Sequence, residues 1–286
     1  HYRRAEELLR DADAAMYRAK AEGRQRFAVF DERLRHQATT LLELENDLRR
    51  ALTRNEFEPW FQPIVRINDG STVGYEALLR WRHPQRGLIG PDDFLQIAED
   101  NGSAEHIDWQ MFALVLQQAP ALLKQGVFIS INLSGRHFRS HQLEQRLLDL
   151  LAQYQVDPAS IRVEVTEHAL LDNPPQVKRT LERLLAHGIQ ASLDDFGTGY
   201  SSLSYLHQYP LQSLKIDQSF VAALADNNEG STPVVRAIQL LADSLGMQVI
   251  AEGIETEAQR TALAAIHCPY GQGFLFGRPA PASHWL

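Results

Sequence analysis

The chain has 286 residues, 44% of them hydrophobic and 22% charged, which is enough apolar material for a sizeable buried core. Its formal net charge of −8 argues against a protein that grips nucleic acid with its whole surface, so a phosphate-bearing ligand would need local cations. No apolar run approaches the roughly 20 residues of a membrane span. The single cysteine, Cys268, cannot form an internal disulfide, which fits a reducing compartment. We expect a cytoplasmic location for this piece and leave open an inner-membrane anchor in a longer parent protein.

Two helical patterns precede residue 55. Residues 3–24 carry apolar side chains at helical spacing and end near Gly23, which predicts one amphipathic helix. A second helix is predicted over 31–54, where leucines recur every seven residues. This repeat has two interpretations of equal weight, a short coiled-coil seam or a helix packed against its own domain. The apolar positions concerned are Leu34, Leu41, Leu44, Leu48 and Ala51.

From residue 57 onward, short β-rich runs alternate with helical patterns. Strands separated by helices pair in parallel, and eight such units in about 230 residues are typical of a closed (β/α)₈ barrel of the TIM type. The connection "RINDGS" after the first run is too short for a helix, so we expect the first strand to be antiparallel. The predicted strands cover 58–65, 72–79, 127–134, 161–167, 189–196, 213–217, 247–254 and 270–277, and the predicted helices 104–123, 141–153, 176–186, 234–245 and 257–265.

Acidic and amide side chains gather toward the carboxyl ends of these predicted strands. In a barrel the loops at those ends converge over one mouth, where the chemistry of this fold collects. Taken singly, each group is better explained as a solvated strand end or a local salt bridge. Together, five of these carboxylates facing one low-dielectric mouth could hardly all ionise beside one lysine; the five are Glu76, Glu164, Asp194, Asp195 and Glu252. Oxygen ligands suit Mg²⁺, Mn²⁺ or Ca²⁺. The acidic and amide residues are Glu76, Asn132, Glu164, Glu167, Asp194, Asp195, Asp217, Glu252, Glu255 and Gln272, and the lysine among them is Lys215.

The adjacent carboxylates of Asp194 and Asp195 follow a hydrophobic run directly. Like charges so close repel each other unless solvent or a cation faces them. A surface loop is the simpler explanation, whereas two metal ions bridged by one carboxylate would give the geometry for in-line displacement at phosphorus.

Two other functional interpretations fail on context. A kinase-like reading of "DFG" at 195–197 lacks a glycine-rich loop and a catalytic-loop motif. His137 and His141 are four residues apart, but no acidic motif surrounds them, and a solvated helix face explains them better than a metal site.

Seven motifs follow one another along the chain: "YEALLRW", "INLS", "EVTE", "DDFGTGYSSL", "LKID", "AEGIET" and "QGFLFGRP". In this order they resemble the EAL-domain phosphodiesterases of bacterial cyclic di-GMP over residues 50–286. In addition, "DADAAMYRAKAEGRQRFAVF" at 11–30 resembles the last helix and strand of a GGDEF domain. The resemblances imply a tandem GGDEF-EAL parent, with a GGDEF remnant over 1–30, a helical linker over 31–54 and the barrel over 55–286.

The resemblance implies hydrolysis of cyclic di-GMP to linear pGpG by a mechanism with two Mg²⁺ or Mn²⁺ ions. This activity would lower the level of a messenger that controls biofilm formation and motility. The implied metal ligands are Glu76, Asn132, Glu164, Asp194, Asp195 and Glu252. The implied catalytic residues are Glu252 as general base, Lys215 beside the attacking water and Glu167 as support of the loop 197–202. The implied substrate contacts are Gln62, Leu79, Arg80, Asp217, Glu255 and Gln272.

Further expectations follow from the resemblance. The partner is cyclic di-GMP rather than a nucleic acid polymer, and a homodimer is expected through the loop after the fifth strand and the adjacent helix. A receptor that binds without turnover is the rival function, but every matched metal position carries a suitable residue, which favours an active enzyme. Phe274 and Phe276 either border a guanine or, as alternating aromatics in a strand more often do, belong to the core.

Overall fold

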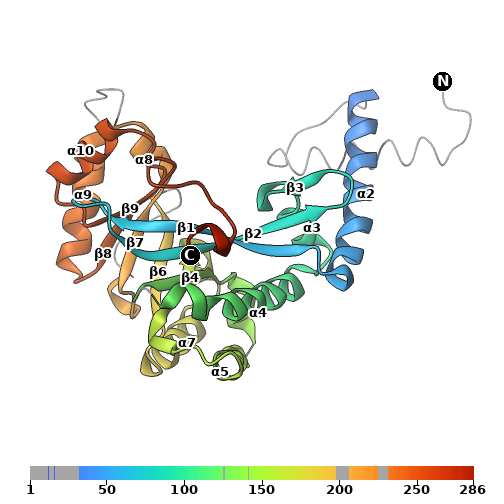
Figure 1. Ribbon diagram of the computed structural model, residues 1–286, viewed down its shortest axis with the longest axis horizontal. Helices are drawn as coiled ribbons and strands as arrows, with labels where there is room; N and C mark the ends of the chain where they lie inside the picture. The colour runs from blue at the N-terminus through green and yellow to red at the C-terminus, as the bar shows by residue number, and fades with distance from the viewer. Residues whose placement is uncertain are drawn as a thin grey trace, which may run out of the picture. The chain divides into compact units, whose positions relative to one another are not determined.

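The computed structural model describes residues 12, 16, 32–124, 126–140, 142–197, 206–224 and 231–286 (Figure 1). The helix predicted over 3–24 lies outside the described residues except for Ala12 and Met16, which are helical. The loop 197–202, apart from Gly197, also lies outside them. Contacts divide the chain into two compact units, a smaller one of residues 1–56 and 81–106 and a larger one of 57–80 and 107–286. In the described part of the chain, no helix is both long and apolar enough to cross a bilayer.

The larger unit contains a closed eight-stranded barrel (Figure 1). Around the barrel the order is β1-β9-β8-β7-β6-β5-β4-β2, and the pairing of β1 with β2 closes it. Neighbouring strands from β2 through β4 to β9 pair in parallel, while β1 is antiparallel to β9, which confirms the predicted barrel and its antiparallel first strand. The strands are β1 (Phe57–Arg66), β2 (Thr72–His83), β4 (Phe128–Asn132), β5 (Ile161–Thr166), β6 (Gln190–Phe196), β7 (Ser213–Ile216), β8 (Gln248–Ala251) and β9 (Tyr270–Gln272).

Helices cover the outside of this barrel. The bounds of α4 and α10 agree with the sequence prediction, and a capping box between Thr256 and Gln259 fixes the start of α10. Two short helices, α6 and α8, were not predicted, because five or six residues are too few to show a helical period. The helices are α4 (Ala104–Leu123), α5 (Leu143–Gln153), α6 (Glu167–Asp172), α7 (Pro174–Ala186), α8 (Gln218–Ala222), α9 (Ser231–Ser244) and α10 (Glu257–Ala265), with single 3₁₀ turns at η2 (Gly135–Arg139), η3 (Pro158–Ser160), η4 (Leu206–Gln208) and η5 (Ala282–His284).

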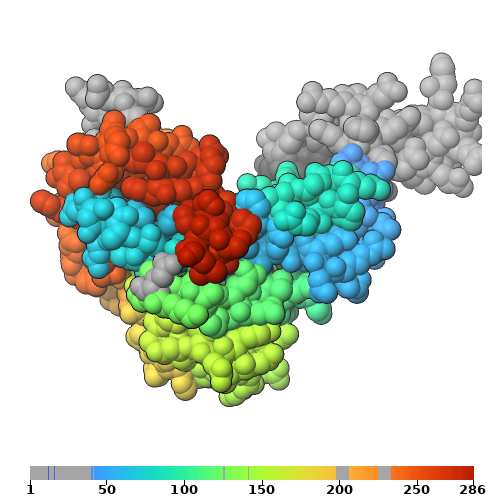
Figure 2. Space-filling view, in the orientation of Figure 1, coloured from blue at the N-terminus to red at the C-terminus, as the bar shows by residue number. Residues whose placement is uncertain are grey.

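The turn between β1 and β2 lies beside α10, as Figure 2 shows for the cyan and orange-red segments. The guanidinium of Arg260 on α10 holds this turn, because its Nε donates to the Ile67 carbonyl at 2.8 Å and its Nη2 to the Asn68 carbonyl at 3.2 Å. The last helix of the barrel is therefore fixed to the first hairpin, which joins the two ends of the barrel sequence.

Alternation along each strand separates an apolar outer face from a polar interior. On β5, Val163 and Val165 belong to the hydrophobic core beneath the helices, whereas Glu164 between them points into the barrel, where Ser130 donates to it. On β7, Leu214 and Ile216 are in the same core and Lys215 is on the inner face. The strands thus direct polar side chains inward at regular intervals.

The last strand is shorter than predicted, ending at Gln272 instead of residue 277. A Cβ on Gly273 would lie 2.2 Å from the backbone of Ile254, so only glycine allows the chain to turn away here. Phe274 is consequently 46% exposed, with the Arg278 guanidinium 4.0 Å from its ring centroid. The core interpretation was wrong for Phe274, while Phe276 is partly buried against the core.

The smaller unit consists of the predicted second helix and the chain that follows β2. Its elements are α2 (Glu32–Arg54), the end of β2, β3 (Gly87–Ile89), the 3₁₀ turn η1 (Pro91–Asp93) and α3 (Leu95–Asp100). Leu44, Leu48 and Ala51 on α2 are buried in this unit. Polar contacts also tie α2 to the end of β2, because Asp47 Oδ2 lies 3.2 Å from His83 Nε2. At these positions the leucine repeat serves packing within the chain, the second of the two interpretations.

We expect Leu48→Ala to destabilise the smaller unit by about 2–5 kcal/mol, because it removes a fully buried side chain. The matched control is Leu42→Ala on the same helix, where the leucine is 55% exposed, and its effect should stay within about 0.5 kcal/mol. Urea unfolding followed by tryptophan fluorescence measures both, since Trp81 belongs to this unit. Equal effects of the two substitutions would contradict the packing described.

Candidate metal and catalytic site

One buried lysine stands among four carboxylates inside the barrel. Lys215 is 1% exposed, and its Nζ lies 2.7 Å from an oxygen of Glu252, 2.8 Å from Glu164, 3.1 Å from Asp194 and 3.3 Å from Glu76. One ammonium can neutralise one of four negative charges. The remaining charge must be relieved by protons or by a cation from outside the chain.

The strand register brings these residues to one level of the barrel. Parallel pairing sets Asn132 on β4 opposite Glu164 on β5, and Thr166 on β5 opposite Asp194 on β6. Glu252 follows β8 directly, and its N–H donates to the Ile216 carbonyl at the end of β7 at 3.0 Å. The acids therefore meet at the carboxyl ends of the strands, where the sequence predicted them.

A bulge in β6 explains how neighbouring aspartates share one site. Successive side chains of a regular strand point to opposite faces. Here the register between β6 and β7 shifts between Leu193 and Phe196, and Asp195 has a left-handed backbone with φ 54°. Consequently Asp194, Asp195 and Glu252 each offer one oxygen, and these oxygens lie within 4.8 Å of one another. Three carboxylate oxygens so close form a group that could hold a hard metal ion.

Amide side chains complete the ring on the side of Glu76. Asn132 Nδ2 donates to Glu76 Oε1 at 3.0 Å, and Gln272 Nε2 donates to Glu76 Oε2 at 2.7 Å and to Gln62 Oε1 at 3.0 Å. Gln62 Nε2 in turn donates to the Gly277 carbonyl at 3.1 Å. Within the described residues, the buried Oε1 of Gln272 has no hydrogen-bond donor. An unsatisfied buried carbonyl in an acidic ring fits a site built to receive a cation or a water.

Ser130 is a member of the site that sequence reasoning missed. Its Oγ donates to Glu164 Oε1 at 2.5 Å. Alternation in "FISIN" places Ser130 and Asn132 on the same face of β4, and this signal could have identified it. Ser130 leaves only one oxygen of Glu164 for Lys215 or a metal.

Burial and neighbouring charge move the pKa values of the acids apart. Burial alone would raise the pKa of Glu76, but the Lys215 ammonium and the amides of Gln272 and Asn132 outweigh burial, so this pKa lies below its ordinary value. Burial and the Glu76 charge raise the pKa of Glu164 well above its ordinary value. The pKa values of two carboxylates that share one lysine are therefore shifted in opposite directions.

The residues closest to the bulge are also poised to bind protons. Burial, together with the charges of Asp194 and Glu76, raises the pKa of Glu252 to about 7 despite the lysine. Burial and the Asp194 charge also raise the pKa of Asp195. Burial would lower the pKa of Lys215, but the surrounding carboxylates raise it well above its ordinary value, so the lysine stays charged.

Other residues implied by the resemblance lie around this ring. Asp217 directly follows β7 and caps α8, because its Oδ1 accepts from the Ser219 N–H at 3.0 Å. Glu167 is buried as the first residue of α6. Glu255 is exposed, and its backbone N–H donates to Gln259 Oε1 at 2.8 Å.

The arginine of "EALLR" is held at the edge of the larger unit. Arg80 is half-buried, its Nη1 donates to the Leu79 carbonyl at 2.8 Å, and its guanidinium lies 5.8 Å from the Trp60 ring centroid. Leu79, also half-buried, packs against the hydrophobic core.

His137 is not on a solvated helix face, and that interpretation was wrong. It is 1% exposed in the 3₁₀ turn after β4, with Nε2 2.9 Å from Asp108 Oδ2. Its ring packs against Trp109 and Phe112. His141, its predicted neighbour, lies outside the described residues.

The fold and the site together define a (β/α)₈-type barrel with an acidic, potentially metal-binding centre at the carboxyl ends of its strands. The chain belongs to the EAL domain family, whose sequence model matches residues 45–279.

Two related proteins and one solved structure support this membership. The bifunctional diguanylate cyclase/cyclic di-GMP phosphodiesterase MucR of Pseudomonas aeruginosa is 40% identical over 283 residues, which are 98% of this chain and 41% of MucR. The cyclic di-GMP phosphodiesterase RocR of the same species is 34% identical over 84% of this chain and 62% of RocR. A solved structure of the PaMucR phosphodiesterase in complex with c-di-GMP has a TM-score of 0.81 at 39% identity, covering 85% of this chain and all of that one. The chain thus spans less than two thirds of these full-length relatives.

The raised pKa of Glu252 predicts a pH-dependent stability of the metal-free protein. The folded form binds this proton more tightly than the unfolded form, so the stabilisation is complete below the ordinary pKa of 4.5 and is lost as the pH rises through about 7. This contribution should be roughly 3 kcal/mol in the wild type, and the loss of stability in Glu252→Gln should be smaller by about that amount. Unfolding measured with a chelator at pH 4.5 and pH 8 tests this. Glu257→Gln, at a 68% exposed glutamate, should behave like the wild type, and an unchanged pH dependence in Glu252→Gln would refute the assignment.

Proposed function

We propose that this chain hydrolyses cyclic di-GMP to linear pGpG with the help of two divalent metal ions. The observation that carries the proposal is the acidic ring around Lys215, with the converging oxygens of Asp194, Asp195 and Glu252. Membership in the EAL domain family and the relatives named as cyclic di-GMP phosphodiesterases supply the substrate.

Two groups of residues would hold the metal ions, which we propose to be Mg²⁺ or Mn²⁺. Glu76, Asn132, Glu164 and Asp194 would ligate one ion, and Asp194, Asp195 and Glu252 the other. When bound, such ions supply Lewis-acid polarisation of the phosphodiester and activation of water. The donor set fits this role, because every member offers a carboxylate or amide oxygen, and one ammonium leaves the ring negative.

Glu252 is the residue suited to accept a proton. A general base works best when its pKa is near the working pH, and in the metal-free protein burial and neighbouring carboxylates raise the pKa of Glu252 to about 7. Its carboxylate lies at the mouth next to Asp195 and 2.7 Å from Lys215 Nζ. We propose that it takes the proton of the attacking water.

Lys215 would orient that water and offset charge that develops on the phosphoryl oxygens. Its ammonium is buried, charged and fixed by four carboxylates, so little reorganisation is needed during the reaction. A compact ammonium with three donors can keep a contact to Glu164 while it donates to a water.

The outer residues would bind the dinucleotide. Arg80 offers a guanidinium that can fork onto two phosphate oxygens. Gln62 and Gln272 form a hydrogen-bonded pair beside Glu76 and would contact substrate or ordered water. Leu79, Asp217 and Glu255 are further proposed contacts, and Glu167 would support the loop 197–202.

We also propose the arrangement of the parent protein. Residues 1–30 would be the remnant of a GGDEF domain, 31–54 a helical linker and 55–286 the phosphodiesterase barrel. A homodimer would form through the loop after β6 and the adjacent helix. In the bacterium the activity would lower cyclic di-GMP and so act on biofilm formation and motility.

The first test is hydrolysis of cyclic di-GMP with added Mn²⁺, with the products separated by chromatography. We expect linear pGpG as product and no turnover after treatment with a chelator. Binding without turnover at saturating Mn²⁺ would show a receptor and overturn the proposal.

Substitutions in the ring should abolish this turnover. Glu76→Ala removes a metal ligand and Lys215→Met removes the ammonium at nearly constant volume, and we expect each to lower kcat at least about 1000-fold. The control is Lys178→Met, at a 46% exposed lysine on α7, which should retain wild-type kcat. Near-normal rates in Glu76→Ala and Lys215→Met would rule out the proposed roles of both residues.

Calcium should bind and inhibit. Ca²⁺ accepts the same oxygen ligands as Mg²⁺ but at longer distances and with a looser geometry, which misplaces the reacting groups. We expect Ca²⁺ alone to support no turnover and to reduce turnover in the presence of Mg²⁺. Robust hydrolysis with Ca²⁺ as the sole divalent ion would contradict the proposed metal geometry.

A further inference from the structure

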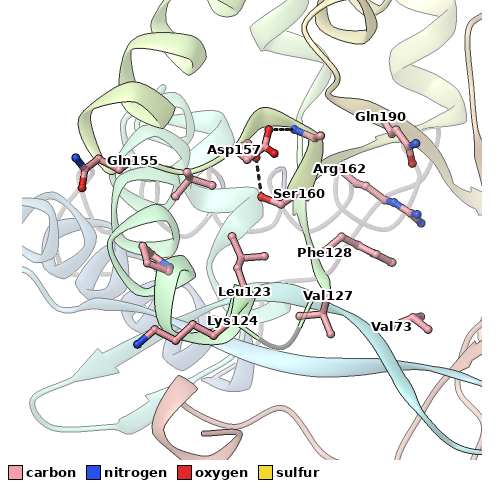
Figure 3. Close-up of a pocket in the computed structure, with 14 residues that line it drawn as sticks. Val73, Leu123, Lys124, Val127, Phe128, Gln155, Asp157, Ser160, Arg162 and Gln190 are labelled. Carbon is pink, nitrogen blue, oxygen red and sulfur yellow. Dashed lines mark hydrogen bonds between the residues drawn. The ribbon is translucent and has the colours of Figure 1, made fainter.

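A second cavity lies at the opposite end of the barrel from the acidic ring. Its volume is about 680 Å³. Phe128 and Gln190 begin β4 and β6, and Arg162 is the second residue of β5, so the cavity opens at the amino ends of these strands (Figure 3). All the residues that line it belong to the larger unit. Neither the acidic ring nor the proposed reaction uses this cavity.

The cavity contains a half-buried arginine on an aromatic platform. The Arg162 guanidinium carbon lies 3.6 Å from the centroid of the Phe128 ring. The same ring also packs against Gly74, where a Cβ would come within 2.5 Å of its carbons. Phe128 is thus held in one place, and the stacked guanidinium is held with it.

The arginine and the lysine of the cavity have no direct ion pair with a carboxylate. Among the described residues, no carboxylate lies within ion-pair distance of Arg162 or of Lys124, which stands at the exposed rim (Figure 3). The carboxylate in the lining, Asp157, caps the turn η3, where its Oδ1 accepts from the Ala159 N–H at 3.0 Å. The Glu164 charge acts on Arg162 only at a distance, and a half-buried guanidinium without a direct ion pair has donors available for an anionic ligand.

Gln190 adds a polar group next to the arginine. Arg162 and Gln190 are direct register partners on β5 and β6, so their side chains leave the same face of the sheet. The rest of the wall combines the polar side chains of Gln155 and Ser160 with aliphatic side chains, which come from Val73, Pro120, Leu123, Val127 and Val156.

We propose that this cavity binds a small organic anion, a carboxylate or phosphate ester with an apolar body. The charged group would be held by Arg162, with Gln190 and Lys124 beside it, and the apolar body would lie on the aliphatic wall. The volume fits a small molecule rather than one inorganic ion, because ligand cavities commonly measure about 300–1,000 Å³. This site is separate from the proposed metal and substrate site and does not depend on it.

The test measures binding of 4-fluorobenzoate and 4-fluorophenyl phosphate to the full chain by ¹⁹F NMR. An excess of chelator keeps the phosphate probe from binding through metals in the acidic ring. We expect saturable binding of at least one probe, and inorganic phosphate should bind at least about tenfold more weakly because it lacks the apolar body. The probe that binds more tightly identifies the charged group. Cyclic di-GMP should not displace either probe.

Two variants and one control assign the binding to the cavity. Arg162→Met removes the charge but keeps an apolar stem, and Gln190→Glu places a carboxylate beside the arginine, so each should weaken binding at least about tenfold. The control is Arg66→Met, since Arg66 is an exposed arginine whose guanidinium lies 5.6 Å from the Tyr270 ring centroid and is not part of the cavity wall. It should bind within about twofold of wild type.

Thermal unfolding shows whether each variant is folded, and Gln190→Glu keeps the test valid if Arg162→Met does not fold. The proposal is overturned if neither probe saturates, if Gln190→Glu binds like wild type, or if Arg66→Met weakens binding as much as the cavity variants do. Displacement by cyclic di-GMP would place the probe in the proposed substrate site and would also overturn it.

Discussion

The arrangement of this barrel depends on an imbalance of charge around one buried lysine. Four carboxylates converge on Lys215 at 2.7–3.3 Å, and a single ammonium cannot neutralise them. The chain relieves part of the excess with protons, as the raised pKa values of Glu164 and Glu252 indicate. It relieves another part with amide donors on Glu76. The negative charge that is still uncompensated makes the ring a candidate site for divalent ions.

The backbone supplies the geometry that this chemistry needs. Parallel strands deliver one inward side chain each to a common level, which accounts for Glu164, Lys215 and their neighbours. A regular strand could not deliver two adjacent carboxylates to the same place. The bulge at Asp194 and Asp195, with its left-handed residue, does so at a local conformational cost of about 1–3 kcal/mol. Such strain is commonly found at functional sites.

The sequence sufficed to predict the barrel, its antiparallel first strand and the acids at the strand ends, because strand alternation and strand termini follow directly from residue patterns. The bulge at Asp195 was not predictable, since it depends on pairing between β6 and β7. Ser130 was not predicted as a site residue, because a serine within a strand carries no charge that points to a site. Its position two residues before Asn132 nevertheless marked the inner face of the strand. The exposure of Phe274 follows from the close approach of Gly273 to Ile254, a tertiary contact that periodicity does not reveal.

The bulge in β6 also makes the site sensitive to chain length as well as to residue type. Deleting one residue between Leu193 and Phe196 would restore regular alternation, and because only Asp194 and Asp195 stand there, it would also remove one aspartate from the cluster. The three-oxygen cluster would then lose a member even though the rest of the acidic ring was unchanged. For members of this fold, alignment gaps at this point of β6 are therefore as informative about the loss of the centre as replacement of an acid.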